Sequence, residues 1–442
     1  MRKLIKNGQI YDGKSDSLKN LDVLINGKYI EDIGKFDFSE EGIEIIDANN
    51  QIVSPGFIDI HSHLREPGYE YKETISTGTM AAAKGGFTTI CAMPTTIPAL
   101  DSHDSIEYLK DLCEIKAKVK VLPIASVTEG RKGKKIVEMQ ILADSGAIGF
   151  SDDGEPVSNN NIMKTALEYS RMVSRPIMNH CDDREINLEG RGVMNEGYLA
   201  QRLGCHGIPN AAEASMLSRD ILLTELTNGN YHACHISASQ SLDVLSMAKK
   251  RGIPFTAEVT PHHLTLTEKY ILGSSDKDQV EIGDNAYNTN AKVFPPLRKD
   301  SDIESMIKGV NNDLITIIAT DHAPHGFEDK MTTLNQAAFG ISNFETSLGS
   351  VLETVHTNQI KLTKLLKCMT SNPAAFLNLK IGQIKKNYPA DITIFDLNKN
   401  WIVDTNNFVS KGKNTPIIGK ELKGKVTITM VDGVIIYSCN GE

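Results

Sequence analysis

The middle of the chain alternates short apolar runs with longer segments in which apolar residues recur at helical spacing. Short apolar runs bounded by turn signals are typical of buried strands, and the longer segments predict amphipathic helices. The strands are predicted at Gly56–His61, Phe87–Ala92, Val119–Ile124, Ala147–Ser151, Pro176–His180, Asn230–His235, Ile253–Glu258 and Ile315–Asp321. The helices between them include Ser76–Lys84, Ser102–Glu114, Ala212–Leu226 and Ser239–Arg251. This alternation favours an α/β fold of the (β/α)8 TIM-barrel type. A doubly wound sheet is the alternative, but its glycine-rich nucleotide fingerprint is absent from the sequence.

Both ends of the chain read instead as strands joined by tight turns. The runs are Lys3–Ile5, Leu21–Ile25, Lys28–Ile33, Asp391–Phe395, Lys425–Val431 and Val434–Tyr437. Asn26-Gly27 and Asp432-Gly433 are typical hairpin turns. We therefore expect a small β-sandwich module formed from both chain ends. The predicted limits are 1–53 and 381–442 for the module and 54–380 for the barrel. Within the barrel, the polar segment from Ser274 to Lys292 predicts a long loop that could cover the active site.

Composition narrows the functional classes. The 442 residues are 40% hydrophobic and 23% charged, which is ordinary for a globular enzyme. Net charge is -9, and Lys and Arg form no long basic run, so nucleic acid is not an expected partner. No apolar run is long enough for a membrane span, and the first residues lack a secretory signal pattern. Seven cysteines without a C-x-x-C pair predict reduced thiols in a cytoplasmic protein.

The strongest chemical signal is the pair His61 and His63. Alternate side chains of a strand share a face, so both imidazoles should point the same way, as a zinc site requires. Two unrelated histidines at a strand end are the alternative. Four further candidates each follow a predicted strand: Asp153, His180, His235 and Asp321. Barrel enzymes place their active sites at these carboxyl ends, so the alignment favours a metal site. Six ligands are too many for one tetrahedral zinc and suit two metals that share a bridging carboxylate.

Several motifs, in order along the chain, carry a family resemblance. They are His61-Ser62-His63-Leu64-Arg65-Glu66-Pro67-Gly68, Lys72-Glu73-Thr74-Ile75, Gly85-Gly86-Phe87-Thr88-Thr89, Ser151-Asp152-Asp153-Gly154, Thr260-Pro261-His262-His263-Leu264, Pro295-Pro296-Leu297-Arg298 and Thr320-Asp321-His322-Ala323-Pro324-His325. Together they resemble the bacterial dihydroorotases, which are cyclic amidohydrolases. The resemblance implies reversible zinc-dependent cyclisation of N-carbamoyl-L-aspartate to L-dihydroorotate in pyrimidine biosynthesis.

The resemblance also implies residue roles. His61 and His63 would hold one zinc and His180 and His235 the other, with Asp153 and a hydroxide as bridges. Asp321 would contact a metal and move the catalytic proton. The implied substrate-binding residues are Arg65, Thr95, His325 and Gly340, of which Arg65 and His325 would bind the substrate carboxylate. A guanidinium matches a carboxylate as a bidentate fork, which supplies the local positive charge that this acidic chain needs.

Two positions depart from the family pattern. Thr95 and Phe294 stand where the family usually has asparagines that bind dihydroorotate. Thr95 can donate one hydrogen bond, whereas Phe294 cannot replace an amide. The alternative is therefore that the chain is another cyclic amidohydrolase, such as a hydantoinase, a dihydropyrimidinase or an allantoinase. A non-catalytic partner of aspartate transcarbamoylase is a further alternative, although such a protein should lose metal ligands. A homodimer is the expected assembly, with aspartate transcarbamoylase as a candidate partner.

Overall fold

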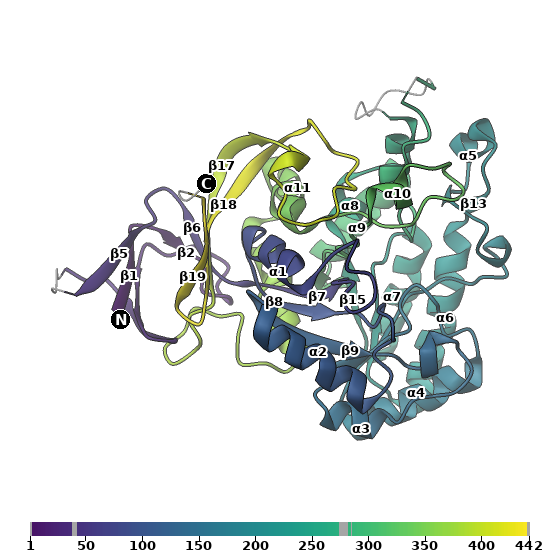
Figure 1. The fold of residues 1–442 in the computed structure, drawn as a ribbon, viewed down its shortest axis with the longest axis horizontal. Coiled ribbons are helices and arrows are strands. Elements are labelled where there is room, and N and C mark those ends of the chain that lie inside the picture. The colour runs from purple at the N-terminus through teal and green to yellow at the C-terminus, as the bar shows by residue number, and fades with distance from the viewer. Residues whose placement is uncertain (1, 38–41, 274–281, 284, 440–442) are drawn as a thin grey trace.

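The structure is a computed structural model that describes residues 2–37, 42–273, 282–283 and 285–439. It divides visibly into a barrel and a smaller β-rich module on which both termini lie (Figure 1). Across the described ranges, no helix is long and apolar enough to cross a lipid bilayer. The predicted loop at 274–292 lies partly outside these ranges; its last part contains a 3-10 turn at Thr289–Ala291.

An eight-stranded sheet forms the barrel. Its order is β7-β8-β9-β10-β11-β14-β15-β16, and neighbouring strands pair in parallel. The strands are β7 (Phe57–Ser62), β8 (Phe87–Ala92), β9 (Lys120–Ala125), β10 (Gly149–Phe150), β11 (Ile177–Asn179), β14 (Tyr231–Ala233), β15 (Thr256–Val259) and β16 (Ile317–Ile318). Every predicted barrel strand is present, and the predicted α/β barrel is confirmed.

The barrel closes between its first and last strands through backbone contacts just beyond β16. The Asp321 amide donates to the His61 carbonyl over 3.0 Å, and the His63 amide donates to the His322 carbonyl over 2.9 Å. Asp59 strengthens this seam, because its carboxylate accepts from the amide and the hydroxyl of Thr320 at 2.9 and 2.6 Å. The same bonds that complete the cylinder therefore fix the backbone of three predicted site residues.

Helices surround the sheet. They are α1 (Ile75–Lys84), α2 (His103–Lys116), α3 (Met139–Asp144), α4 (Asn160–Val173), α5 (Tyr198–Leu203), α6 (Asn210–Thr227), α7 (Ser239–Arg251), α8 (Pro261–Thr265), α9 (Asp300–Asn311), α10 (Phe327–Lys330), α11 (Phe344–His356), α12 (Leu362–Met369) and α13 (Ser371–Phe376). Local sequence sets their starts: α1 begins after Thr74 and α2 after Ser102, and each hydroxyl accepts a backbone N–H from the first turn. A small pair, β12 (Met194–Asn195) and β13 (Gly207–Ile208), lies between β11 and α6.

The module contains two sheets, and one of them combines both ends of the chain. Its strands are β1 (Arg2–Lys6), β2 (Gln9–Ile10), β3 (Asp22–Asn26), β4 (Tyr29–Gly34), β5 (Ile43–Asp47), β6 (Ile52–Pro55), β17 (Ile392–Ile402), β18 (Glu421–Val431) and β19 (Val434–Ser438). One sheet has the order β4-β3-β1-β5, and the other has the order β19-β18-β17-β6-β2. Since β6 pairs with β17, the predicted module built from both ends is confirmed. The domain limits at 53/54 and 380/381 stay predictions.

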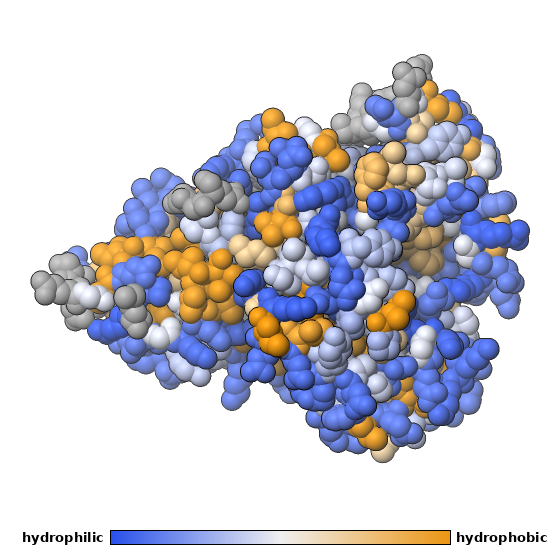
Figure 2. Space-filling view, in the orientation of Figure 1, coloured by the Kyte–Doolittle hydropathy of each residue, from blue (hydrophilic) through white to orange (hydrophobic). Residues whose placement is uncertain are grey.

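Apolar packing separates these parts. One buried cluster includes Ile58 of β7, Met178 of β11 and Ile317 of β16. These strands lie at the two ends and in the middle of the strand order, so the cluster fills the barrel interior. A second cluster, which includes Val23 and Ile394, joins the two sheets of the module. On the outer surface, apolar residues gather over the module, while the visible face of the barrel is mostly hydrophilic (Figure 2).

Candidate active site

The first pair of predicted ligands lies at the end of β7. The His61 Nε2 atom is 3.3 Å from Asp153 Oδ1 and 3.6 Å from Asp321 Oδ1. The His63 Nε2 atom is 3.0 Å from Asp321 Oδ1 and 3.5 Å from Asp153 Oδ2. Two imidazoles and two carboxylates therefore face one small volume. The strand periodicity predicted this shared direction, and β10 and β16 supply the two acids.

The second pair comes from β11 and β14. His180 Nδ1 lies 2.9 Å from His235 Nε2, and these atoms are 3.8 and 3.7 Å from Asp153 Oδ1. Asp153 thus lies between the two histidine pairs, where the sequence places a bridge. All six predicted ligands are brought together, and all are buried. Their roles as ligands stay a prediction, which the geometry makes specific.

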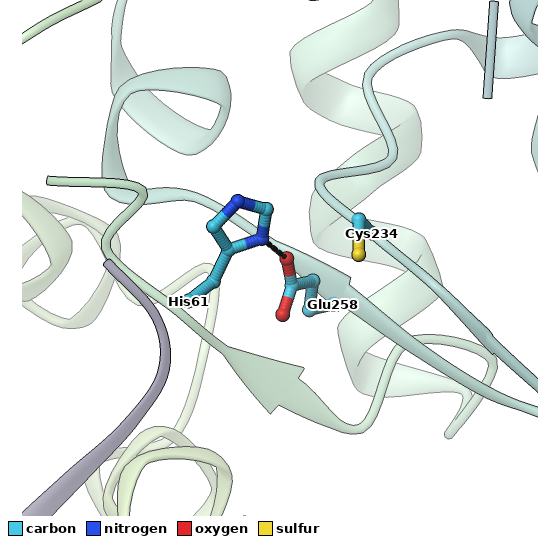
Figure 3. Close-up of side chains that lie close together, drawn as sticks. All are labelled: His61, Cys234 and Glu258. Carbon is cyan, nitrogen blue, oxygen red and sulfur yellow. Dashed lines mark hydrogen bonds and ion pairs between the residues drawn. The ribbon is translucent and has the colours of Figure 1, made fainter. Parts of the chain in front are cut away.

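The hydrogen-bonding of His61 provides a test of whether a metal fits. Its Nδ1 lies 2.6 Å from Glu258 Oε1, so this nitrogen carries the proton and donates to the carboxylate (Figure 3). Its Nε2 faces the two aspartates, and the charges of Glu258 and Asp153 raise the pKa of His61 well above its ordinary value despite burial. The Nε2 atom is completely buried and has no hydrogen-bond partner among the described residues. A buried imidazole nitrogen beside two carboxylates is a place where a metal ion can replace a proton, so the residues present fit a metal ion.

Glu258 holds two imidazoles and is a residue that the motifs did not single out. Besides His61, it contacts His232 Nε2 at 3.1 Å through its other oxygen. Cys234 lies beside His61 and Glu258 in Figure 3. Burial raises the pKa of its thiol, so the thiol stays protonated. Burial would also raise the pKa of Glu258, but the charge of His61 and the hydrogen bonds from His232 and His61 lower it below its ordinary value. Glu258 is therefore ionised and orients His61.

Electrostatics favour ionised acids and a neutral imidazole at the centre. Burial would raise the pKa of Asp153, but the charge of His61 and a hydrogen bond from His235 hold it well below the usual range. Burial would raise the pKa of Asp321, but a hydrogen bond from His63 and the charges of His61, His63 and His235 together lower it. Burial, together with the nearby His235, lowers the pKa of His180 to about 3. Carboxylates and a neutral imidazole are the forms that bind metal ions.

Three site residues have a left-handed backbone. The φ angles are 63° at Arg65, 30° at His235 and 46° at Asp321. This region is sparsely populated for residues other than glycine, and such strain concentrates where the surrounding fold positions functional side chains. The closing bonds around β7 and β16 hold Asp321 in this conformation.

A pocket of about 290 Å³ opens beside the six-residue cluster. Its walls include all four predicted substrate residues, Arg65, Thr95, His325 and Gly340. The Thr95 hydroxyl lies 2.7 Å from His63 Nδ1, so one residue contacts both the cluster and the pocket. Their roles toward a substrate stay predictions.

The wall beside His180 is apolar. Phe294, which replaces an expected asparagine, packs with its ring centroid 4.3 Å from the His180 ring and 5.3 Å from the Phe339 ring. The pocket also has cationic walls, since Lys72 and Arg131 line it together with Arg65. Neither was assigned a role from the sequence, although Lys72 belongs to a motif that supports the resemblance. The pocket therefore combines an apolar wall with cations that suit an anion.

Comparison with known proteins identifies the relatives of this arrangement. The family model described as Dihydro-orotase-like matches residues 50–241. Over 439 residues the chain is 44% identical to "Dihydroorotase" of Thermoanaerobacter sp. (strain X514), covering 99% of this chain and 97% of that protein. The protein with the same name from Syntrophus aciditrophicus (strain SB) is 41% identical, with 99% of both chains covered. The chain belongs to the dihydroorotase family. Membership makes it an amidohydrolase that acts on a small molecule.

Solved structures with the same fold come from related amidohydrolases. The L-hydantoinase (dihydropyrimidinase) of Arthrobacter aurescens aligns with a TM-score of 0.86 at 22% identity, covering 99% of this chain and 96% of that one. The dihydropyrimidinase of Brevibacillus agri NCHU1002 aligns with a TM-score of 0.83 at 20% identity, covering 98% and 95%. At such identities the likeness shows the fold, and dihydroorotase membership comes from the closer sequence relatives.

Proposed function

We propose that this member of the dihydroorotase family is a zinc-dependent dihydroorotase that interconverts N-carbamoyl-L-aspartate and L-dihydroorotate. One observation carries the proposal: six buried histidine and aspartate side chains converge beside a pocket that Arg65, Lys72 and Arg131 also line. The substrate has a ring amide to cleave and a carboxylate to bind, and the pocket offers a matching place for each. Dihydroorotase is also the name of relatives that match nearly the whole length of the chain.

The cluster would hold two zinc ions. His61 and His63 would bind one, His180 and His235 the other, with Asp153 between them and Asp321 beside the first. Bound there, zinc would polarise the amide carbonyl and lower the pKa of the attacking water. Glu258 would keep His61 in the tautomer that leaves Nε2 available, as carboxylates commonly do for ligating histidines.

Asp321 would move the proton. In ring opening it would accept the proton of the attacking water and deliver it to the leaving amide nitrogen; cyclisation runs the same steps in reverse. Its carboxylate suits this task because it is ionised and held at 3.0 Å from His63 Nε2. Arg65 would bind the substrate carboxylate, which places the ring amide over the cluster. The Phe294 ring would form an apolar wall beside the bound ring.

The experiment is turnover of dihydroorotate, and of carbamoyl-aspartate in reverse, with the metal content of the same sample measured. We expect turnover in both directions with close to two zinc ions per chain. Hydantoin and dihydrouracil, which lack the carboxylate, are the comparison substrates, and each should be turned over far more slowly than dihydroorotate. Full zinc loading with faster turnover of these neutral rings would overturn the substrate assignment. A chain that binds no metal would overturn the enzyme mechanism.

A further inference from the structure

Lys72 is a half-buried lysine that lines the pocket and whose head group is held by several partners. Its side chain is only 13% exposed, and its Nζ lies 3.2 Å from His325 Nδ1 and 3.3 Å from Asp329 Oδ2. The rings of Tyr69 and Tyr71 lie 5.3 and 5.4 Å from the ammonium, within the range of cation–π attraction. A lysine side chain is normally mobile, so four partners around one ammonium indicate a fixed position.

The hydrogen bonds of His325 show which donors remain for a ligand. An ammonium only donates, so His325 Nδ1 accepts from Lys72. His325 Nε2 lies 2.8 Å from the Phe339 carbonyl, which only accepts, so Nε2 carries the proton. Both ring nitrogens therefore have protein partners. Arg65 Nη2, 3.3 Å from the same Nε2, faces a nitrogen that already carries a proton, so this contact is not a hydrogen bond.

The consequence is that the cations themselves present the available donors. Lys72 has three N–H groups; His325 and Asp329 account for two, and the third is left on the side chain that lines the pocket. Arg65 donates Nε to the Pro324 carbonyl at 3.2 Å, which leaves its terminal nitrogens toward the pocket. The imidazole of His325 lies between the two cations, within 3.3 Å of each.

We propose that Lys72 binds the substrate carboxylate together with Arg65, as a second cation of the specificity site. This inference rests on the proposed function and names a residue that determines its substrate class. Thr95 retains one hydroxyl and Phe294 offers no donor, so the two cations supply the charge that a substrate carboxylate needs. A ring that carries a carboxylate is then preferred over a neutral one.

The test uses the full-length zinc-loaded enzyme and the variants Lys72→Met and Lys72→Gln. Gln removes the charge but keeps an amide N–H that can donate to His325 Nδ1, whereas Met keeps the length of the side chain without any donor. We expect both variants to raise the KM for dihydroorotate, and the Kd for orotate measured by calorimetry, by about ten- to a hundred-fold, with kcat within a few-fold of the parent. Orotate serves as probe because it carries the carboxylate and requires no turnover.

Lys385→Met is the matched control. Lys385 also lies over a tyrosine ring, 5.4 Å from Tyr388, but it does not line the pocket, so its removal subtracts the same charge elsewhere. The control should leave KM and orotate binding unchanged. Parent-like KM and orotate Kd in both Lys72 variants would overturn the role of Lys72 even if the enzyme is a dihydroorotase. If the parent turns over no dihydroorotate, the proposed function fails, while orotate binding still decides whether Lys72 is an anion-binding residue.

Discussion

At the residue scale, the site depends on which nitrogen of each imidazole is committed to the protein. His61 uses Nδ1 for Glu258, and His63 turns Nδ1 to Thr95, so both leave Nε2 toward the aspartates. His180 differs, since its Nδ1 is the atom that faces Asp153. The outer hydrogen bonds therefore determine the donor set as much as the six ligands do.

Replacing Asp321 by Asn should remove proton transfer while leaving the cluster nearly intact. Asn cannot accept a proton at neutral pH, so kcat should fall by about two to four powers of ten. The measurement is kcat together with zinc content by elemental analysis, which should stay close to that of the parent. Parent-like kcat with full zinc would contradict the role of Asp321.

Replacing Glu258 by Gln should weaken zinc binding without touching zinc. Gln offers one weak acceptor where His61 and His232 now share a carboxylate, so zinc affinity should fall about ten- to a hundred-fold. Competition with a chromogenic chelator measures it. Glu345→Gln removes another buried carboxylate outside the pocket and should leave zinc affinity unchanged. Equal affinities in all three proteins would show that Glu258 does not orient a ligand.

The sequence located the six candidate ligands because each follows an apolar run. Strand ends of a parallel barrel meet on one side, so position alone brought His61 and Asp321 together. Glu258 was missed although it ends the predicted strand Ile253–Glu258. The structure places it within β15, where it contacts two histidines that are distant in the chain. Lys72 was read as part of a motif, but its contact with His325 joins residues far apart in the chain.

At the element scale, strand positions were predictable and strand partners were less so. The short apolar runs of β7 and β8 predicted these strands, and both are buried throughout. The four-residue β6 was not predicted. Its pairing with β17 depends on packing between distant segments, which local propensity does not record. The barrel seam also lay beyond prediction, since it uses the carboxylate of Asp59 and the backbone of His322.

Helix α11 carries a carboxylate whose ionisation should affect stability. Burial raises the pKa of Glu345 to about 7, against the backbone hydrogen bonds from Val409 and Ser410 that lower it. A raised carboxyl pKa means that the folded state binds the proton more tightly. Its contribution is therefore largest below pH 4.5, the ordinary value, and is lost as pH rises to about 7.

Glu345→Gln should remove the loss of stability that accompanies ionisation of Glu345. As pH rises from 4.5 to 7, the free energy of unfolding of the variant should increase relative to the parent by up to about 3 kcal/mol. Above pH 7 this difference should stay constant. Urea unfolding of metal-free protein at a series of pH values measures the difference. A gap between the two proteins that is constant across this range would show that Glu345 keeps an ordinary pKa.

At the scale of the whole molecule, the barrel and the module are joined by specific backbone contacts. The Thr429 hydroxyl of β18 donates to the Ala83 carbonyl of α1 at 2.6 Å, and the Thr393 hydroxyl of β17 donates to Gly86 at 2.5 Å. These bonds connect the module to the first strand–helix unit of the barrel. The predicted homodimer and the association with aspartate transcarbamoylase stay predictions.

Metal removal should destabilise the whole barrel, because the ligands come from five of its strands and their carboxylates would be left facing each other. Any ligand that binds only the folded state adds stability that grows with the logarithm of its concentration relative to its Kd. Treatment with a strong chelator should lower Tm by several degrees, and added zinc should restore it. The metal content of each sample should be measured alongside its melting curve. Equal Tm values for metal-free and zinc-loaded protein would contradict the prediction.

The pairing of β6 with β17 has a consequence during synthesis. Val53 of β6 pairs with Ile394 of β17, which the ribosome adds more than three hundred residues later. At about 5–20 residues per second, that interval is roughly 20 to 70 s, during which one edge of a half-made sheet has no neighbour. An open edge can recruit strands from other nascent chains. Expression yield should therefore depend on chaperones that shield this edge, even where the finished enzyme is stable.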